Sequence, residues 1–123
     1  MTIEEAISRI DALKPNTYTQ EEKIEWLSTV DGIIKRQIID THEDGEDIVF
    51  EGYTEDTPLD TELIAGHPYD ELYVDWLEAK IDYYNAEYAR YNNSITRYND
   101  VFQAYLNNYN RIHMPKGTKI KYW

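Results

Sequence analysis

The sequence predicts an all-α fold: a small helical bundle with one long tyrosine-rich C-terminal helix and a long acidic loop. Two N-terminal segments repeat apolar residues at helical spacing behind a helix-capping signature, and residues 77–112 hold an unbroken heptad pattern. Glycine, proline and acidic residues gather between these parts, as is typical of a loop. A length of 123 residues fits a single domain over residues 1–123.

The first helix is predicted over residues 2–13. Thr2 can cap it, because Glu5 follows three residues later and completes a capping box. Pro15, after Lys14, ends the helix. Its apolar stripe consists of Ile3, Ile7, Ile10 and Leu13.

The second helix is predicted over residues 19–41 by the same signature, since Glu22 follows Thr19. Gly32 weakens its middle by about 1 kcal/mol relative to alanine, which allows a kink or a close packing contact there. Its buried face is expected to consist of Ile24, Leu27, Val30 or Ile34, and Ile38, with Trp26 beside them.

Residues 42–67 form the acidic, irregular part of the chain. Ten acidic residues lie between Asp40 and Glu62, together with glycines and a proline. Residues 48–50 can form a short strand or pin the loop to the core, and residues 59–65 can form a short helical turn. A long loop of this kind in a compact domain is usually functional or mobile.

The third helix is predicted over residues 68–113, beginning at Pro68 and ending before Pro115. Its apolar residues are spaced by alternating steps of four and three, which is the coiled-coil period. Tyrosine is a poor knob for a two-stranded zipper, because its buried hydroxyl needs a partner. The heptad residues are Leu77, Ile81, Tyr84, Tyr88, Tyr91, Ile95, Tyr98, Phe102, Tyr105, Tyr109 and Ile112.

The length of this helix raises a question of geometry. A continuous helix over residues 68–113 would run about 69 Å, whereas a globule of this chain length is roughly 35 Å across. Either the helix projects and is covered by neighbouring subunits, or it kinks or folds into a hairpin at Asn92-Asn93. We favour the continuous helix, because the heptad keeps its phase across those residues. An arm over residues 114–123, extended or a short strand, follows it.

Charge is distributed unevenly along the chain. The net charge of −12 lies wholly in residues 1–66, and no Lys or Arg occurs between Gln37 and Ala79. Such an asymmetry suits head-to-tail stacking of identical subunits or docking between two partners. It argues against sequence-specific nucleic-acid binding, which needs a basic face. The chain has no cysteine and no apolar run long enough to span a membrane.

Several patterns resemble chemical sites without completing them. Residues 40–51 imitate a calcium loop, but His42 replaces a ligand and no helix follows Glu51. The histidines are too scattered for a metal triad, and no phosphate loop or nucleophile motif occurs. We therefore expect no catalytic residue, no metal and no cofactor. The tyrosines are expected to pack the core, although a sugar-binding platform or a base-stacking surface is chemically open.

Residues 68–116, PYDELYVDWLEAKIDYYNAEYARYNNSITRYNDVFQAYLNNYNRIHMPK, resemble a family of small structural proteins of tailed phages and prophages of Gram-positive bacteria. The stretch KPNTYTQEEKIEWLSTVDGII fits the same family, so the resemblance covers most of the chain. It implies a virion component, made in the bacterial cytoplasm, that acts in head completion or head-tail connection. The implied partners are the portal, a neighbouring connector ring and further copies of the chain.

Under that reading, the chain is not an enzyme and acts through protein-protein contacts. Packing and oligomer contacts are expected from Trp76, Tyr84, Tyr91, Tyr98, Phe102, Tyr105 and Tyr109, and tail contacts from Lys116, Lys119, Lys121 and Trp123. The acidic residues 42–67 are expected to touch a neighbour. The alternatives are an inhibitor of phage origin, such as an acidic DNA mimic, and an enzyme that uses the acidic loop with a divalent ion.

Overall fold

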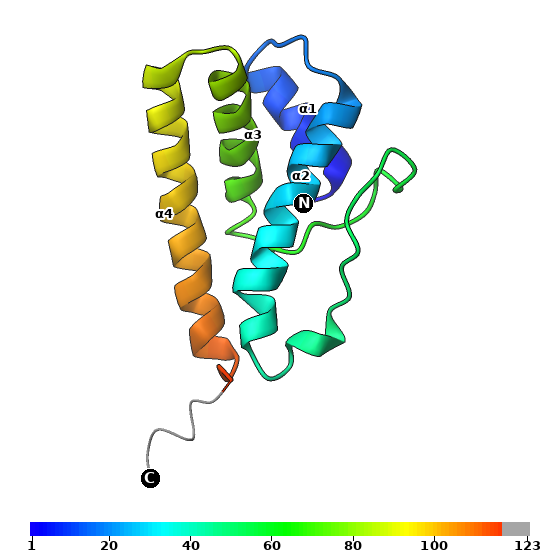
Figure 1. The fold of residues 1–123 in the computed structure, drawn as a ribbon, viewed down its shortest axis with the longest axis vertical. Helices are drawn as coiled ribbons and strands as arrows, with labels where there is room; N and C mark the ends of the chain where they lie inside the picture. The colour runs from blue at the N-terminus through cyan, green and yellow to red at the C-terminus, as the bar shows by residue number, and fades with distance from the viewer. Residues whose placement is uncertain (117–123) are drawn as a thin grey trace.

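The computed structural model describes residues 1–116, and the predicted all-α fold is confirmed over them. The two N-terminal helices are α1 (Ile3–Leu13) and α2 (Gln20–Gln37), and the hairpin helices are α3 (Glu71–Tyr84) and α4 (Tyr88–Ile112). Two short 3-10 helices, η1 (Ile39–Thr41) and η2 (Gly45–Asp47), follow α2. Figure 1 shows α3 and α4 as an antiparallel pair, with α1 and α2 beside α3 and the segment from η2 to α3 along the outside of α2.

Both N-terminal caps form as predicted. The amide N–H of Glu5 donates to the Thr2 hydroxyl over 3.1 Å, and the Thr2 amide donates to the Glu5 carboxylate over 3.2 Å. At α2, the Glu22 amide donates to the Thr19 hydroxyl over 3.1 Å. These interactions satisfy donors that the first helical turn leaves free, which is why the two helices begin where the sequence predicts.

The predicted continuous helix over residues 68–113 is wrong, and so is a hairpin at Asn92-Asn93. The chain reverses at residues 85–87, and Asn92 and Asn93 lie inside α4. The Glu87 amide donates to the carbonyl of Asp82 over 2.9 Å across this turn, and Ala86 takes a φ of +59°. The heptad spacing therefore did not require a continuous helix: part of the stripe is buried on each hairpin helix, Leu77 and Ile81 on α3 and Tyr98, Tyr105 and Tyr109 on α4. Tyr84 and Tyr88, next to the turn, are exposed.

The backbone at Ala86 leads to our first stability prediction. A left-handed conformation costs an L-residue with a Cβ roughly 1–2 kcal/mol, and glycine avoids that cost. We expect Ala86→Gly to raise the free energy of unfolding by about 0.5–1 kcal/mol in urea denaturation. Ala89→Gly is the matched control, because it removes a methyl group inside α4 and is expected to lower stability by about the same amount. Equal losses in both variants would contradict the prediction.

The core lies where α2 and α3 meet α1 and α4. Ile3, Ile7 and Ile10 of α1 are buried, as their spacing predicts. The apolar residues of α4 that are buried in this core are tyrosines, and the aliphatic residues of α4 that pack against it are only partly buried. The fully buried aliphatic side chains include Leu27, Val30, Ile34, Ile38, Ile39, Leu72, Leu77 and Ile81.

The acidic part of the chain is irregular, as predicted, and two groups of α2 hold it: a buried carboxylate, and the Ser28 hydroxyl, to which the Tyr53 amide donates over 2.9 Å. Asp31 accepts hydrogen bonds from the hydroxyls of Tyr53 and Tyr73, each over 2.5 Å. It also accepts the Ile64 amide over 3.1 Å. The helical turn considered for residues 59–65 does not form. A single turn closes at the start of this stretch, where the Thr61 amide donates to the Pro58 carbonyl over 3.1 Å. The chain then pairs with the N-terminus, where the Ile3 amide donates to the Thr61 carbonyl over 3.1 Å.

No strand forms at residues 48–50, and this part of the segment instead contacts α2 through one aromatic ring. Phe50 packs edge-on against Tyr53, with ring centroids 5.0 Å apart. A Cβ placed on Gly32 would lie 3.7 Å from the same ring, so α2 comes close to the segment at its glycine. Of the two alternatives for residues 48–50, attachment of the loop to the core is therefore the one that holds.

Candidate functional site

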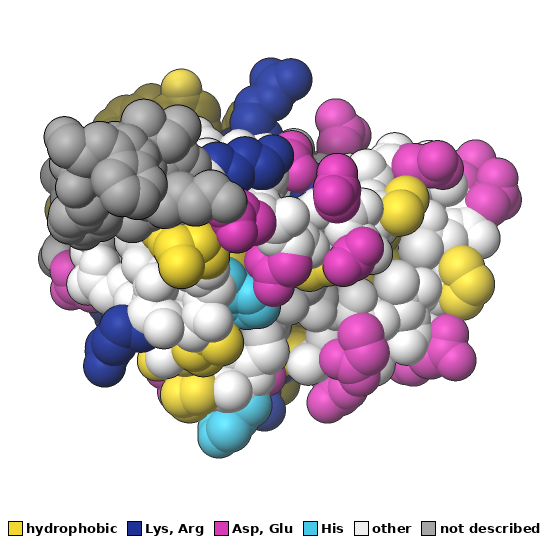
Figure 2. Space-filling model, turned by 90° about the horizontal axis from the view of Figure 1, so that it is seen from below, with side chains coloured by type: hydrophobic (Ala, Val, Ile, Leu, Met, Phe, Trp, Pro, Cys, Tyr) yellow, Lys and Arg dark blue, Asp and Glu magenta, His cyan; other side chains and the backbone are white. Residues whose placement is uncertain are grey.

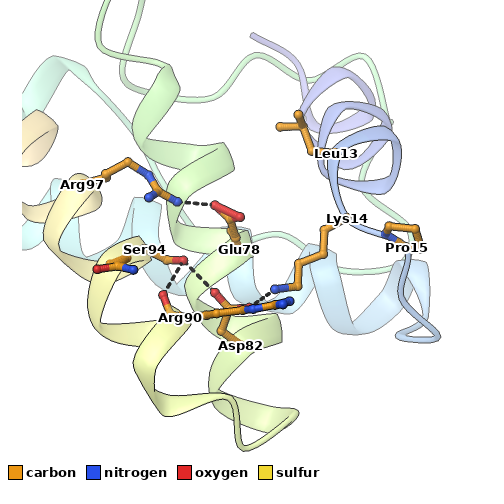
Figure 3. Close-up of a pocket in the computed structure, with 9 residues that line it drawn as sticks. Leu13, Lys14, Pro15, Glu78, Asp82, Arg90, Ser94 and Arg97 are labelled. Atoms are coloured by element: carbon orange, nitrogen blue, oxygen red, sulfur yellow. Dashed lines mark hydrogen bonds and ion pairs between the residues drawn. The ribbon is translucent and has the colours of Figure 1, made fainter.

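The helical hairpin has a polar pocket on one side. A cavity of about 420 Å³ lies between the end of α1 and the two hairpin helices, and Figure 3 shows its lining. Lys14 reaches into it from the end of α1 and pairs with Asp82 of α3, which is buried. The lining residues are Leu13, Lys14, Pro15, Glu78, Asp82, Arg90, Asn93, Ser94 and Arg97.

The charges of this pocket are paired with one another. Asp82 also accepts the Ser94 hydroxyl over 2.7 Å, and Arg97 donates to Glu78 over 2.5 Å. Burial opposes the charge of Lys14, but the hydrogen bonds and charges of Asp82 and Glu87 outweigh it and raise the pKa of the amine. Ser94 donates to a carboxylate that already holds a lysine, so its hydroxyl is not activated as a nucleophile. The pocket works as a clamp that ties the end of α1 to the hairpin.

The other side of the hairpin carries an aromatic groove. We call it the tyrosine groove; it encloses about 330 Å³ and is lined by Trp76, Ala79, Lys80, Tyr83, Tyr84, Tyr91 and Ile95. Tyr83 and Tyr84 are 51% and 56% exposed, and Tyr88 beside them is 59% exposed. Exposed aromatic side chains clustered in this way usually mark an interaction site, because single exposed apolar residues are common but contiguous patches are not.

Ring contacts hold the groove in a fixed shape. Tyr84 stacks on Trp26 of α2, with centroids 5.7 Å apart and ring planes 8° from parallel. Tyr83 lies 5.4 Å from Tyr84 and 5.5 Å from Tyr91, measured between ring centroids. At the base, the indole N–H of Trp76 donates to the carbonyl of Trp26 over 2.9 Å. A groove built before its partner arrives loses little conformational entropy on binding.

The turn next to the groove is tied to the rest of the bundle. The hydroxyl of Tyr18 donates to the side-chain oxygen of Asn85 over 2.7 Å. The ring of Tyr18 also meets Trp26 edge-on, with centroids 5.3 Å apart. The groove charge comes from Lys80, whose amine lies 4.8 Å above the Trp76 ring.

The predicted interaction residues divide between the groove and the core. Trp76, Tyr84 and Tyr91 line the groove. Phe102 is half-buried, and Tyr98, Tyr105 and Tyr109 are buried in the core. The sequence pattern missed Tyr83, Lys80 and Tyr18. The sequence signal for Tyr83 was its place beside Tyr84, directly before Asn85. A helix that ends at this point exposes both tyrosine rings.

Of the predicted tail residues, Lys116 is described and is exposed. Its backbone N–H donates to the carbonyl of Thr41 over 2.9 Å, which joins the chain after α4 to η1. Lys119, Lys121 and Trp123 lie outside the described residues.

The opposite end of the molecule carries the acidic segment. Residues 44–51, which we call the acidic segment, include Ile48 at 36% and Val49 at 80% exposure. Figure 2 shows this end from below, with Asp and Glu side chains over one side of it and hydrophobic side chains exposed among them. Asp44 pairs with His113 after α4, and Asp40 pairs with Lys35 of α2. Within residues 1–116, no group of three or more His, Asp or Glu side chains is placed to hold a metal ion.

None of the helices described over residues 1–116 combines the length and apolar character needed to cross a lipid bilayer. Comparison with protein-family models, with curated proteins and with solved structures gave no match to this chain.

Proposed function

We propose that this chain is a phage structural protein, a head-tail connector or head-completion subunit that acts through protein-protein contacts in a ring. The observation that carries the proposal is the tyrosine groove, which is preformed and exposed on a helical hairpin. Rigid tyrosine and tryptophan side chains are the typical anchors of protein interfaces, because they bury much area at a low cost in side-chain entropy.

The form of the molecule supports the same proposal. The lining residues of the groove flank the turn between α3 and α4, while the acidic segment begins near the other end of α4. Two different surfaces at opposite ends suit heterologous contacts, which close into rings when the rotation between copies allows it. The resemblance of residues 68–116 to phage structural proteins supports the choice of a connector among such assemblies.

Under this proposal the partners are the portal protein, a neighbouring connector ring and further copies of the chain. The protein would be made in the bacterial cytoplasm and would end as a virion component. The groove would contact one neighbour, and the acidic segment and the basic tail, from Lys116 onward, would contact others.

An acidic DNA mimic is the second candidate, and one observation favours it. A mimic needs carboxylates on a rigid surface, and the acidic part of the chain is fixed to α2 through Asp31 rather than hanging free. Such an inhibitor would bind a basic host nuclease in a complex that dissociates at high salt. A connector would instead stay bound to its partners at the same high salt concentration, because its groove contacts are apolar.

The proposal is tested by the mass of the complex in solution. We expect light scattering to show a complex of the chain with the portal protein of the phage that encodes it. The double variant Tyr83→Ser/Tyr88→Ser is expected to weaken that complex about tenfold, since it removes two exposed anchors. Ile112→Ser, which removes an exposed apolar residue at the other end of α4, is the matched control and is expected to change little.

Two outcomes would overturn the proposal. The first is a chain that remains a monomer with the portal and with every other structural protein of the phage. The second is a double variant that binds as well as the parent while circular dichroism shows the same fold. A salt-sensitive complex with a host nuclease, and none with the portal, would support the DNA mimic in its place.

A further inference from the structure

We infer that the tyrosine groove of one copy receives residues 48–50 of a second copy, so that the chain associates head to tail with itself. The inference rests on the proposed function, because it names the partner of the same groove. It is carried by the form of the acidic segment, by the charges of the two surfaces and by their places in the fold.

The acidic segment has the form of a peptide ligand. Val49 is 80% exposed although it is apolar, and Ile48 beside it is 36% exposed. The peptide groups of residues 49–51 make no hydrogen bond within the described part of the chain. The ring of Phe50 lies next to Gly32 of α2, and the backbone at Ile48, directly after η2, is extended. The segment thus presents two apolar side chains directly after η2, at a point held beside α2.

The tyrosine groove matches this ligand in size and character. Its 330 Å³ are lined by aromatic rings and by the small side chain of Ala79, and pockets of this size take a few side chains rather than a whole domain surface. Val49 and Ile48 can bury their methyl groups among these rings. The hydroxyls of Tyr83 and Tyr91 lie on the same side chains and can meet the unpaired peptide groups of the segment.

The charges of the two surfaces are complementary. Carboxylates of Glu46, Asp47 and Glu51 flank the apolar residues of the segment. Lys80 is the charged residue of the groove lining, and its amine is positive. A carboxylate that meets the Lys80 amine would fix the register of the docked segment and speed its association.

The places of the two surfaces exclude docking within one molecule. The Glu43 amide donates to the Met114 carbonyl over 3.0 Å, so the segment begins at the C-terminal end of α4. From there it runs along the outside of α2, away from α3 and α4, with Phe50 next to Gly32 (Figure 1). The groove is lined by residues of the C-terminal part of α3 and the N-terminal part of α4, on either side of the turn. The groove must therefore receive the segment of another copy.

Cross-linking tests the contact directly, because the parent chain has no cysteine. A chain with Val49→Cys is mixed with a mass-tagged chain with Tyr83→Cys, and a short bismaleimide is added. We expect a mixed dimer in the mixture and mostly monomer from either chain alone. The same two substitutions in one chain are expected to give a ladder of oligomers, since each copy then offers both ends.

Asn107→Cys in place of Tyr83→Cys is the matched control, because Asn107 is exposed on the part of α4 away from the groove. It is expected to give at least tenfold less mixed dimer with Val49→Cys. Equal yields from the two acceptor positions, or products only between like chains, would overturn the inference. The cross-linking is repeated at increasing protein concentration, up to the concentration at which light scattering detects self-association of the parent chain. If no mixed dimer forms even at that concentration, the inference is also contradicted.

Exchanging the charges of the two surfaces distinguishes a specific contact from non-specific association. Lys80→Glu is expected to lower the yield of mixed dimer about fivefold, and Glu46→Lys/Glu51→Lys in the partner is expected to restore most of it. Failure of the exchange to restore the yield would leave no role for these charges and would refute the proposed register. The proposed function has its own readout in portal binding, so a chain that binds the portal without a mixed dimer fails only the present inference.

Discussion

Asp31→Ala is expected to lower the free energy of unfolding by about 3–4 kcal/mol. The substitution leaves the hydroxyls of Tyr53 and Tyr73 and the Ile64 amide without their acceptor, and each such group costs about 1–3 kcal/mol when it stays buried. The loss is measured by urea denaturation, with the exposed Asp100→Ala as control, for which we expect almost no change.

The same substitution is expected to release the acidic part of the chain before the bundle unfolds. Tyr53 and Ile64 attach this part to α2 through Asp31, while α1 and the hairpin helices contact one another independently of it. Limited proteolysis after Phe50 or Tyr53 should therefore accelerate in Asp31→Ala more than in a variant of equal global stability. If the cleavage rate of Asp31→Ala equals that of a variant with the same global stability, the Asp31 carboxylate stabilises the whole fold and does not specifically attach the acidic part of the chain to α2.

The pH dependence follows from the burial of this carboxyl. Desolvation raises the pKa of Asp31 above 3.8, although the hydrogen bonds from Tyr53, Tyr73 and Ile64 act in the opposite direction. The native state thus holds the proton more tightly than the unfolded chain. The contribution of the group to stability is fully present below pH 3.8 and is lost as the pH rises through the raised pKa.

The pH dependence is measured against a variant that cannot titrate. The stability of the parent minus that of Asp31→Asn should fall as the pH rises from 3.8, because asparagine keeps the size of the side chain and one acceptor oxygen. A constant difference across that range would show that Asp31 holds its proton no more tightly in the folded state.

The contacts that the sequence predicted correctly are local ones. Thr2 with Glu5, and Thr19 with Glu22, are three residues apart, so the backbone of the first turn brings them together wherever the rest of the chain goes. Asp31 lies four residues after Leu27 and three before Ile34, on the predicted buried face of α2, so the spacing did indicate its burial. Its partners Tyr53, Ile64 and Tyr73 are far away in sequence, and no local pattern identifies them.

The turn between α3 and α4 escaped prediction for a different reason. Residues 85–87 carry neither glycine nor proline, and Ala86 is among the best helix formers, yet it adopts a left-handed conformation. Tertiary packing of the two apolar stripes overrides that local preference. The groove was half predicted as a result. Tyr84 and Tyr91 belong to the heptad stripe and Trp76 was predicted beside it, whereas Tyr83, one residue before the end of α3, was not predicted.

Gly45→Ala is expected to lower the free energy of unfolding by about 2–3 kcal/mol, through overpacking rather than through a lost contact. A Cβ at this position would lie 1.9 Å from the carbonyl oxygen and 2.7 Å from the carbonyl carbon of Ile39. Both atoms are backbone, so no side chain can rotate away, and the corner between η1 and η2 must open.

Opening that corner would also disturb the junction with α4. His42, in the corner, is buried with its Nε2 2.8 Å from the side-chain oxygen of Asn110, and its ring meets Tyr109 edge-on at 4.6 Å between centroids. The Glu43 amide bonds the Met114 carbonyl in the same place. Gly45→Ala should therefore shift the amide signals of residues 110–114 in NMR spectra, although the substituted residue belongs to another segment.

Two other glycines of the chain serve as matched controls for Gly45. A Cβ on Gly66 would meet nothing within 4 Å, so Gly66→Ala is expected to change stability by less than about 0.5 kcal/mol. A Cβ on Gly32 would make an ordinary 3.7 Å contact with Phe50 inside α2, so Gly32→Ala is expected to stabilise by about 0.5–1 kcal/mol. Adding the same methyl group is thus expected to destabilise the fold at Gly45, to leave stability almost unchanged at Gly66 and to stabilise the fold at Gly32, because the surroundings of the three glycines differ. A Gly45→Ala variant that melts like Gly66→Ala would mean that the corner yields without cost, and that His42 rather than the close backbone approach fixes η1 to α4.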